Sequence, residues 1–135
     1  MSKRILVDTN LIVRYLVQDD EKHAAAAGKL FDACDRGDIV VVILSPVLCE
    51  CVFVLESFYR HPRAEIASAL ARFISSRGVE IESQALHLDA LHRYRSTRAH
   101  FVDSLIAAAA ASADIAVASF DRDFRKFPDV RIEIE

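Results

Sequence analysis

The sequence predicts an α/β protein of one domain, with helices on both faces of a parallel sheet. Short aliphatic runs alternate with helix-like segments along the whole chain, and strands that alternate with helices form parallel sheets. The length of 135 residues suits a single core. Hydrophobic residues make up 53% of the chain, with only 3 Gly and 3 Pro, which excludes a disordered chain. A three-layer α/β/α sandwich over residues 1–135 is therefore expected.

The first elements follow from local patterns. Arg4–Val7 is a short aliphatic run that predicts a buried strand, and a helix from Asn10 to Val17 follows it. A second helix opens at Asp19-Asp20 and ends at Gly37. Ile39–Leu44 is six consecutive aliphatic residues, which indicates a strand buried on both faces. Ser45-Pro46, a capping hydroxyl before a proline, predicts the start of a helix that runs to about Tyr59.

The alternation continues to the end of the chain. The remaining predicted elements are a helix over 62–77 closed by Gly78, a strand over 79–82, an amphipathic helix over 84–97, an alanine-rich helix over 102–112, a strand over 115–119 and an edge strand over 130–134. Four phenylalanines are expected in the core: Phe31, Phe53, Phe58 and Phe73.

Charge and targeting signals limit the function classes. The formal net charge is −3, whereas a passive RNA-binding module needs a basic surface. An enzyme that meets phosphate through bound cations does not need one. Too few apolar residues precede Asp8 for a signal peptide, and acids interrupt the longest apolar stretch, Phe101–Phe120. We therefore expect a cytoplasmic protein with no membrane segment, in which three cysteines stay reduced as small apolar residues: Cys34, Cys49 and Cys51.

Four acidic residues occupy positions where a parallel sheet gathers its ligands, beyond the carboxyl ends of its strands. Asp8 and Asp121 each follow a predicted strand. Glu50 lies one turn into the helix after the second strand, and Asp103 lies in the first turn of the alanine-rich helix. Taken singly, each has a structural explanation as a helix cap, a dipole partner or a turn residue.

Glu50 is the hardest of the four to explain structurally. Its helical neighbours include Val47, Phe53 and Val54, and no basic residue lies between Gly37 and Arg60 to pair with it locally. A carboxylate on an apolar stripe costs several kcal/mol unless it is paired or coordinated. We therefore expect Glu50 to bind a metal and to be the most strained of the four acids.

The ligand types favour a hard cation. Carboxylate oxygens suit Mg²⁺ or Mn²⁺, which keep several waters and accept phosphate oxygens. Such ions activate water and stabilise the charges of phosphodiester hydrolysis. The five histidines lack HExxH spacing and the cysteines lack CxxC spacing, so zinc is not expected.

Four motifs in register resemble the PIN-domain toxins of the VapC type, over about residues 4 to 124. They are Asp8-Thr9-Asn10 with Arg14-Tyr15-Leu16 and Asp19-Asp20, Ser45-Pro46 through Glu50 with Leu55 and Tyr59, Phe101-x-Asp103-Ser104-Leu105-Ile106-Ala107, and Ser119-x-Asp121-Arg122-Asp123-Phe124. The resemblance implies a five-stranded parallel PIN fold and an endoribonuclease that depends on Mg²⁺ or Mn²⁺.

The resemblance also implies roles for single residues and for partners. It carries catalysis and metal binding onto Asp8, Glu50, Asp103 and Asp121. Asn10 and Ser119 match accessory polar positions, and Asp123 matches a more variable acidic one. His100 stands where many relatives have a further Asp, and we expect it to be peripheral. The implied partners are an RNA substrate and a small antitoxin that seats on the apolar helices Leu11–Val17 and Cys49–Phe58; a homodimer is also expected.

Weaker signals and rival functions remain open at this point. Basic side chains near the acids are equally explained as RNA contacts or as solvated helix ends: Arg93, Arg95, Arg98 and Arg122. A haloacid-dehalogenase-type phosphatase would need a second Asp at Asn10 and a lysine ahead of the late acids, and both are missing. A catalytically idle PIN domain that serves as an interaction module is the other rival.

Overall fold

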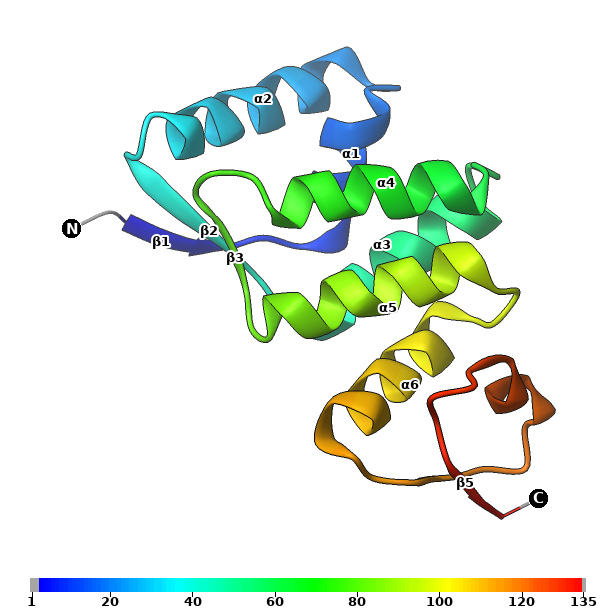
Figure 1. Cartoon of the computed structure of the whole chain (residues 1–135). Helices are drawn as coiled ribbons and strands as arrows, with labels where there is room; N and C mark the ends of the chain where they lie inside the picture. The colour runs from blue at the N-terminus through cyan, green and yellow to red at the C-terminus, as the bar shows by residue number, and fades with distance from the viewer. Residues whose placement is uncertain (1–2, 135) are drawn as a thin grey trace. The chain divides into compact units, whose positions relative to one another are not determined.

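A computed structural model describes residues 3–134 of the chain (Figure 1). Its elements are, in order, β1 (Lys3–Leu6), α1 (Thr9–Val17), α2 (Glu21–Asp35), β2 (Ile39–Ile43), α3 (Ser45–Ser57), α4 (Arg63–Ile74), β3 (Val79–Ile81), α5 (Gln84–Ser96), α6 (Phe101–Ala113), β4 (Val117–Ala118), the 3-10 helix η1 (Arg122–Lys126) and β5 (Ile132–Ile134). Every predicted helix and strand is present within a few residues of its predicted bounds, and η1 was not predicted. The chain divides into two compact units, one ending at Glu82 and one beginning at Ser83, and each is described by itself.

The strands pair in parallel, as predicted, but they form two sheets. β2 lies between β1 and β3, with Val41 opposite both Ile5 and Val79. β4 pairs with β5, and Val117 lies opposite Ile132. The prediction of one five-stranded sheet is therefore wrong for residues 3–134. The physical reason is that β4 has only two residues and an irregular register. So short a strand offers few backbone N–H and C=O groups with which to pair with a second neighbour.

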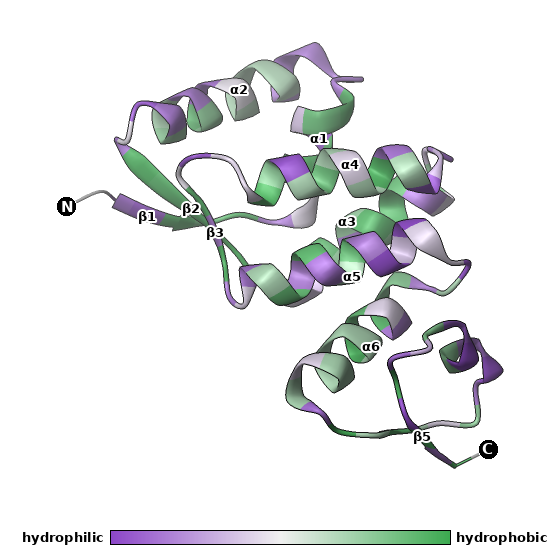
Figure 2. Cartoon of the chain, in the orientation of Figure 1, coloured by the Kyte–Doolittle hydropathy of each residue, from purple (hydrophilic) through white to green (hydrophobic). Residues whose placement is uncertain are grey.

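The first unit packs four helices around the three-stranded sheet. α1 packs on α2 and α3, α2 packs on β2, and α4 packs on α3 and β3. β2 is hydrophobic along its length (Figure 2). Tyr15, Phe31 and Phe73 form an aromatic cluster. The centroid of the Phe31 ring lies 4.4 Å from that of Tyr15 and 5.2 Å from that of Phe73.

Two predicted core residues of this unit are wrong. Phe31 and Phe73 are buried, but Phe53 and Phe58 are exposed. α3 is apolar almost all round, so its sequence does not show which side is buried. In the structure the buried stripe has helical spacing: Leu48, Cys51, Val52 and Leu55.

The beginning of α3 also differs from its prediction. The N-cap is Leu44, with no side-chain hydrogen bond at the cap, so the expected capping role of Ser45 is wrong. Pro46 still lies in the first helical turn, where its missing N–H removes no intrahelical bond.

The second unit is a helix pair with a small apolar core. α5 packs on α6, and α6 packs on β4 and η1. Buried alanines of α6 allow this close approach, and Phe124 and Phe127 close the core over Val117. None of the helices within residues 3–134 combines the length and apolarity that a bilayer crossing requires.

The cysteines behave as apolar side chains. Cys34 and Cys51 are buried, Cys49 is partly buried, and all three are free thiols. Burial, followed by the nearby charge of Glu50, raises the pKa of the Cys51 thiol to about 12. A thiol that stays protonated at neutral pH is a poor nucleophile, so the structural interpretation of these residues is confirmed.

Candidate functional site

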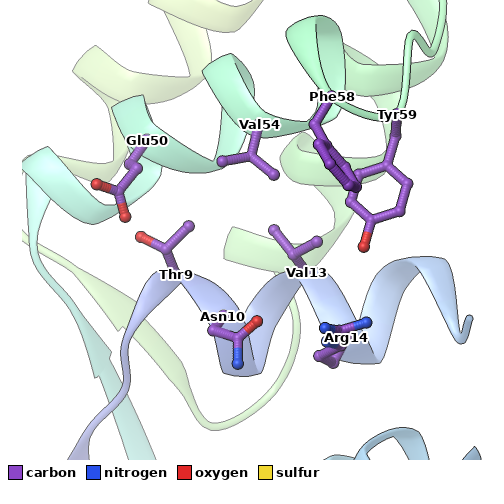
Figure 3. Close-up of a pocket in the computed structure, with 8 residues that line it drawn as sticks. All are labelled: Thr9, Asn10, Val13, Arg14, Glu50, Val54, Phe58 and Tyr59. Carbon is purple, nitrogen blue, oxygen red and sulfur yellow. The ribbon is translucent and has the colours of Figure 1, made fainter. Parts of the chain in front are cut away.

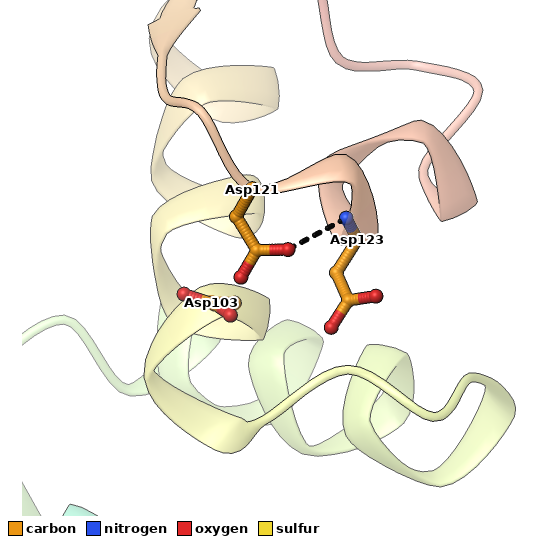
Figure 4. A group of neighbouring side chains, drawn as sticks. All are labelled: Asp103, Asp121 and Asp123. Carbon is orange, nitrogen blue, oxygen red and sulfur yellow. Dashed lines mark hydrogen bonds between the residues drawn. The ribbon is translucent and has the colours of Figure 1, made fainter.

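Three aspartates of the second unit form an acidic triad: Asp103, Asp121 and Asp123 (Figure 4). Each offers a carboxylate oxygen, and these oxygens lie within 4.8 Å of one another. That spread is close to the roughly 4 Å that separates opposite ligands of one Mg²⁺ ion. Asp103 comes from the first turn of α6, whereas Asp121 and Asp123 come from the N-terminus of η1. The structure thus brings together two of the four predicted catalytic acids, and it adds Asp123, which the sequence indicated only as accessory.

Local hydrogen bonds orient Asp121 within this triad. Its backbone N–H donates to Ser119 Oγ at 3.0 Å, and its Oδ1 accepts the backbone N–H of Asp123 at 2.9 Å. Ser119 therefore holds the turn that presents Asp121. Lys126 Nζ lies 2.9 Å from Asp123 Oδ1 and balances part of the negative charge.

The triad changes the acidity of its most enclosed member. Asp103 is partly buried, and its pKa is raised, first by burial and then by the charge of Asp121. Asp123 adds to this effect, and His100 opposes it. A metal ion bound here would relieve both the burial cost and the repulsion, because it supplies the missing positive charge.

Asp8 caps a helix in the first unit. Its Oδ1 accepts the backbone N–H of Leu11 at 3.0 Å, at the N-terminus of α1. The side chain is exposed, so one oxygen satisfies the helix end while the residue stays accessible from solvent. The structural explanation from sequence is confirmed for Asp8, and it does not compete with a further role as a ligand, since a carboxylate has two oxygens.

Glu50 lies on the rim of a pocket between α1 and α3 (Figure 3). Its side chain is exposed, on the opposite side of α3 from the buried stripe. The sequence argument that Glu50 is desolvated by apolar neighbours is therefore wrong, because Phe53 shares its exposed side of the helix instead of burying it. Burial and repulsion act instead on Asp103, whose pKa is raised.

The pocket itself has a volume of about 280 Å³ and is lined by residues of the first unit. Its members are Thr9, Asn10, Val13, Arg14, Glu50, Val54, Phe58 and Tyr59. At one end Arg14 Nη1 donates to Asp19 Oδ1 at 3.1 Å, and Tyr59 Oη donates to Asp19 Oδ2 at 2.8 Å. All three residues belong to the sequence motifs, but these hydrogen bonds could not be predicted from them, because Tyr59 is 40 positions from Asp19. Asn10, a predicted accessory residue, lines the same pocket as Glu50.

The four arginines predicted to contact RNA differ in their exposure to solvent. Arg93 donates to Asp89 and to Asp129, the latter from Nη1 at 2.8 Å, and its guanidinium lies 5.7 Å from the Phe127 ring centroid. Only 13% of its side chain is exposed. Arg95, Arg98 and Arg122 are exposed. Arg93 therefore has a structural role in the second unit, whereas the other three side chains face solvent.

Comparisons with known proteins identify a matching family and a similar solved structure. The family model described as "PIN domain" matches residues 5–130. Among solved structures, the chain is similar to Mycobacterium tuberculosis VapC20, described as a Sarcin-Ricin loop cleaving toxin. The two are 26% identical, the match covers 93% of this chain and 98% of that chain, and the TM-score is 0.43. No protein of curated function matches the chain significantly.

Proposed function

The chain belongs to the PIN-domain family, and we propose that it is a metal-dependent endoribonuclease. The observation that carries the proposal is the acidic triad, whose three carboxylates come from two different elements, α6 and the start of η1. Carboxylates this close repel one another, and Lys126 offsets only part of their charge, so a bound cation would stabilise their arrangement. The motif resemblance, which spans the chain in order, supports the same function.

We propose that Asp103 and Asp121 of the acidic triad hold the ion with support from Asp123, and the motif resemblance implies that Asp8 and Glu50 are also required for catalysis. Oxygen ligands favour Mg²⁺ or Mn²⁺. Such an ion supplies an activated water and offsets the negative charge of phosphodiester hydrolysis. The chain's own residues hold this chemistry in place: Ser119 fixes the turn before Asp121, and Asp8 is fixed by its bond to the start of α1.

Cleavage assays test the proposal. Purified protein should cut single-stranded RNA in Mg²⁺ or Mn²⁺ and lose that activity in excess EDTA. Asp8→Ala, Glu50→Ala, Asp103→Ala and Asp121→Ala should each abolish cleavage. Asp38→Ala is the matched control, since its exposed carboxylate pairs with Arg36 and belongs to none of the predicted site residues. Undiminished cleavage in EDTA, or in any two of the four variants, would falsify the metal-site proposal and leave the interaction-module alternative.

A second part of the proposal concerns RNA contacts. Arg95, Arg98 and Arg122 are exposed cations, and phosphate contacts make binding weaken as salt rises. Replacing any one of them with Gln should lower RNA affinity and reduce the steepness of the salt dependence. Arg93→Gln should instead lower the unfolding temperature, because it leaves Asp89 and Asp129 without their buried partner.

The third part is a toxin role with a protein antitoxin. The pocket between α1 and α3 coincides with the two helices that the sequence indicated for the antitoxin, and Val13 and Val54 line it. Phe58 is 75% exposed at its edge. A volume of about 280 Å³ suits one apolar side chain of a bound segment rather than a drug-sized ligand. We expect the protein, expressed from its own locus, to co-purify with a small second protein.

Two variants separate the pocket from general surface effects. Val54→Arg fills the pocket and should release the antitoxin. Phe53→Arg is the matched control, because Phe53 is exposed one position earlier and does not line the pocket. Equal retention of the partner by both variants would contradict the proposed seat. The predicted homodimer is checked by sedimentation equilibrium of the purified chain.

A further inference from the structure

Phe120 is an apolar side chain with no evident structural use. It is 87% exposed, more than any other large hydrophobic side chain in the described part of the chain. Exposing a whole aromatic ring forgoes the 1.5 to 3 kcal/mol that burial of such a side chain typically contributes. A polar residue in this turn would avoid that loss.

The core of the second unit is complete without Phe120. Its aromatic members are Phe124 and Phe127, both buried, and they pack with Val117 and the alanines of α6. Phe120 is not part of this cluster. Its presence therefore has to be explained by something other than the packing of this unit.

The backbone around Phe120 is fixed by bonds on its C-terminal side. The N–H of Asp121 donates a hydrogen bond to Ser119 Oγ, and this bond bridges the two residues that flank Phe120. The N–H of Asp123 donates to Asp121 Oδ1. These bonds close two short turns in succession. Phe120 is thus held directly before Asp121, a member of the acidic triad, and the exposed Arg122 follows it.

We propose that Phe120 is a stacking surface for one unpaired base of the RNA next to the scissile phosphate. This inference rests on the proposed ribonuclease function. The chemistry is that of single-strand binding, in which aromatic rings stack on bases while cations meet the phosphates. A phenyl ring has no hydrogen-bonding atom, so Phe120 positions a base without reading its identity. Stacking also requires an unpaired base, so this contact favours loops and single strands over duplex RNA.

Base fluorescence tests the inference directly. The experiment uses the Glu50→Gln variant, because this change is expected to stop cleavage and leaves the acidic triad intact. It is mixed, in Mg²⁺, with eight-nucleotide RNAs that carry 2-aminopurine at one position in turn. Stacking should quench the 2-aminopurine at one position. Phe120→Ala should remove this quenching and weaken affinity by about 5-fold to 150-fold, the range for one stacked base.

Matched variants identify the ring as the cause. Phe120→Trp should keep the quenching, whereas Phe120→Leu, which keeps apolar surface but no ring, should lose it. Ile115→Ala is the control, because Ile115 is another exposed apolar residue of the same unit, 58% exposed. Unfolding temperatures of Phe120→Ala and Phe120→Leu should equal that of the background chain.

Each other outcome has a distinct meaning. Equal RNA affinity and equal quenching with Phe, Leu and Ala at position 120 overturn the stacking inference while the ribonuclease proposal stands. A lowered unfolding temperature in Phe120→Ala assigns the ring to packing and also overturns it. Loss of antitoxin binding without loss of RNA binding assigns Phe120 to the protein partner. No RNA binding by any of these chains contradicts the proposed function itself.

Discussion

The fold disfavours the ionised form of Asp103. Its pKa is raised by burial and by Asp121, so the folded chain binds a proton at Asp103 more tightly than the unfolded chain does. The stability of the metal-free protein therefore increases as pH falls from the raised pKa toward the ordinary Asp range. Above that window the ionised Asp103 is a constant destabilising contribution.

Asp103→Asn removes this contribution and keeps the shape of the side chain. In EDTA at pH 7 the variant should unfold at a higher temperature than the parent, and the difference should vanish below about pH 4, where an ordinary Asp is protonated. Mg²⁺ should stabilise the parent more than the variant, because only the parent keeps the full ligand set. Melting curves across pH, with and without Mg²⁺, measure both effects. A variant less stable than the parent in EDTA at pH 7 would refute the repulsion argument.

His100 is a second residue whose role was open in the sequence. It is exposed at the N-cap of α6, and its backbone carbonyl accepts the N–H of Ser104 at 2.9 Å. That bond is made by the main chain, so it survives a change of side chain. His100→Ala should therefore retain most cleavage activity at neutral pH. A loss as large as that of Asp103→Ala, measured in the same assay, would show that His100 acts in the reaction.

At the scale of elements, the turn before β3 is constrained at Gly78. Gly78 has φ +78°, and a Cβ there would lie 2.8 Å from the Cys34 carbonyl oxygen and from Cys34 Cβ. The left-handed backbone alone costs an ordinary residue roughly 1–2 kcal/mol, and the contact with α2 adds to this. Gly78→Ala should therefore be strongly destabilising, which urea denaturation measures.

Gly28 offers the matched comparison. It lies inside α2, where nothing would contact an added Cβ within 4 Å. Alanine is the better helix former by about 0.5–1 kcal/mol, so Gly28→Ala should stabilise the protein by that amount. Opposite signs for the two Gly→Ala changes are the expected result. Equal effects would mean that neither the left-handed conformation at Gly78 nor its close approach to Cys34 limits the side chain at this position.

At the scale of the whole molecule, the question is whether the two compact units fold together. The family match runs from residue 5 to residue 130 as one domain. We therefore expect one cooperative unfolding transition, with equal calorimetric and van't Hoff enthalpies. Gly78→Ala in the first unit and Phe124→Ala in the core of the second should lower the same transition. Two separate transitions, each moved by only one variant, would contradict a single domain.

The sequence by itself determined the elements and the kinds of residue that carry the chemistry. Periodicity placed every helix and strand of residues 3–134 within a few positions, because burial of one stripe or run dictates where apolar residues recur. Four motifs in order indicated the family that the comparison shows. The sequence also placed Asp103 and Asp121 among four acids expected to gather beyond the strand ends, and these two do lie together.

Tertiary structure alone decided the pairing of strands, the exposed side of α3 and the membership of the acidic triad. A strand's pattern shows that it pairs but not with which partner, so the division into two sheets was not foreseeable. α3 is apolar on nearly every side, so only packing shows that Glu50, Phe53 and Phe58 are exposed. Asp123 joined the triad because the short helix η1 turns its carboxylate toward Asp103, and such one-turn helices depend on local hydrogen bonds and packing rather than on a periodic pattern.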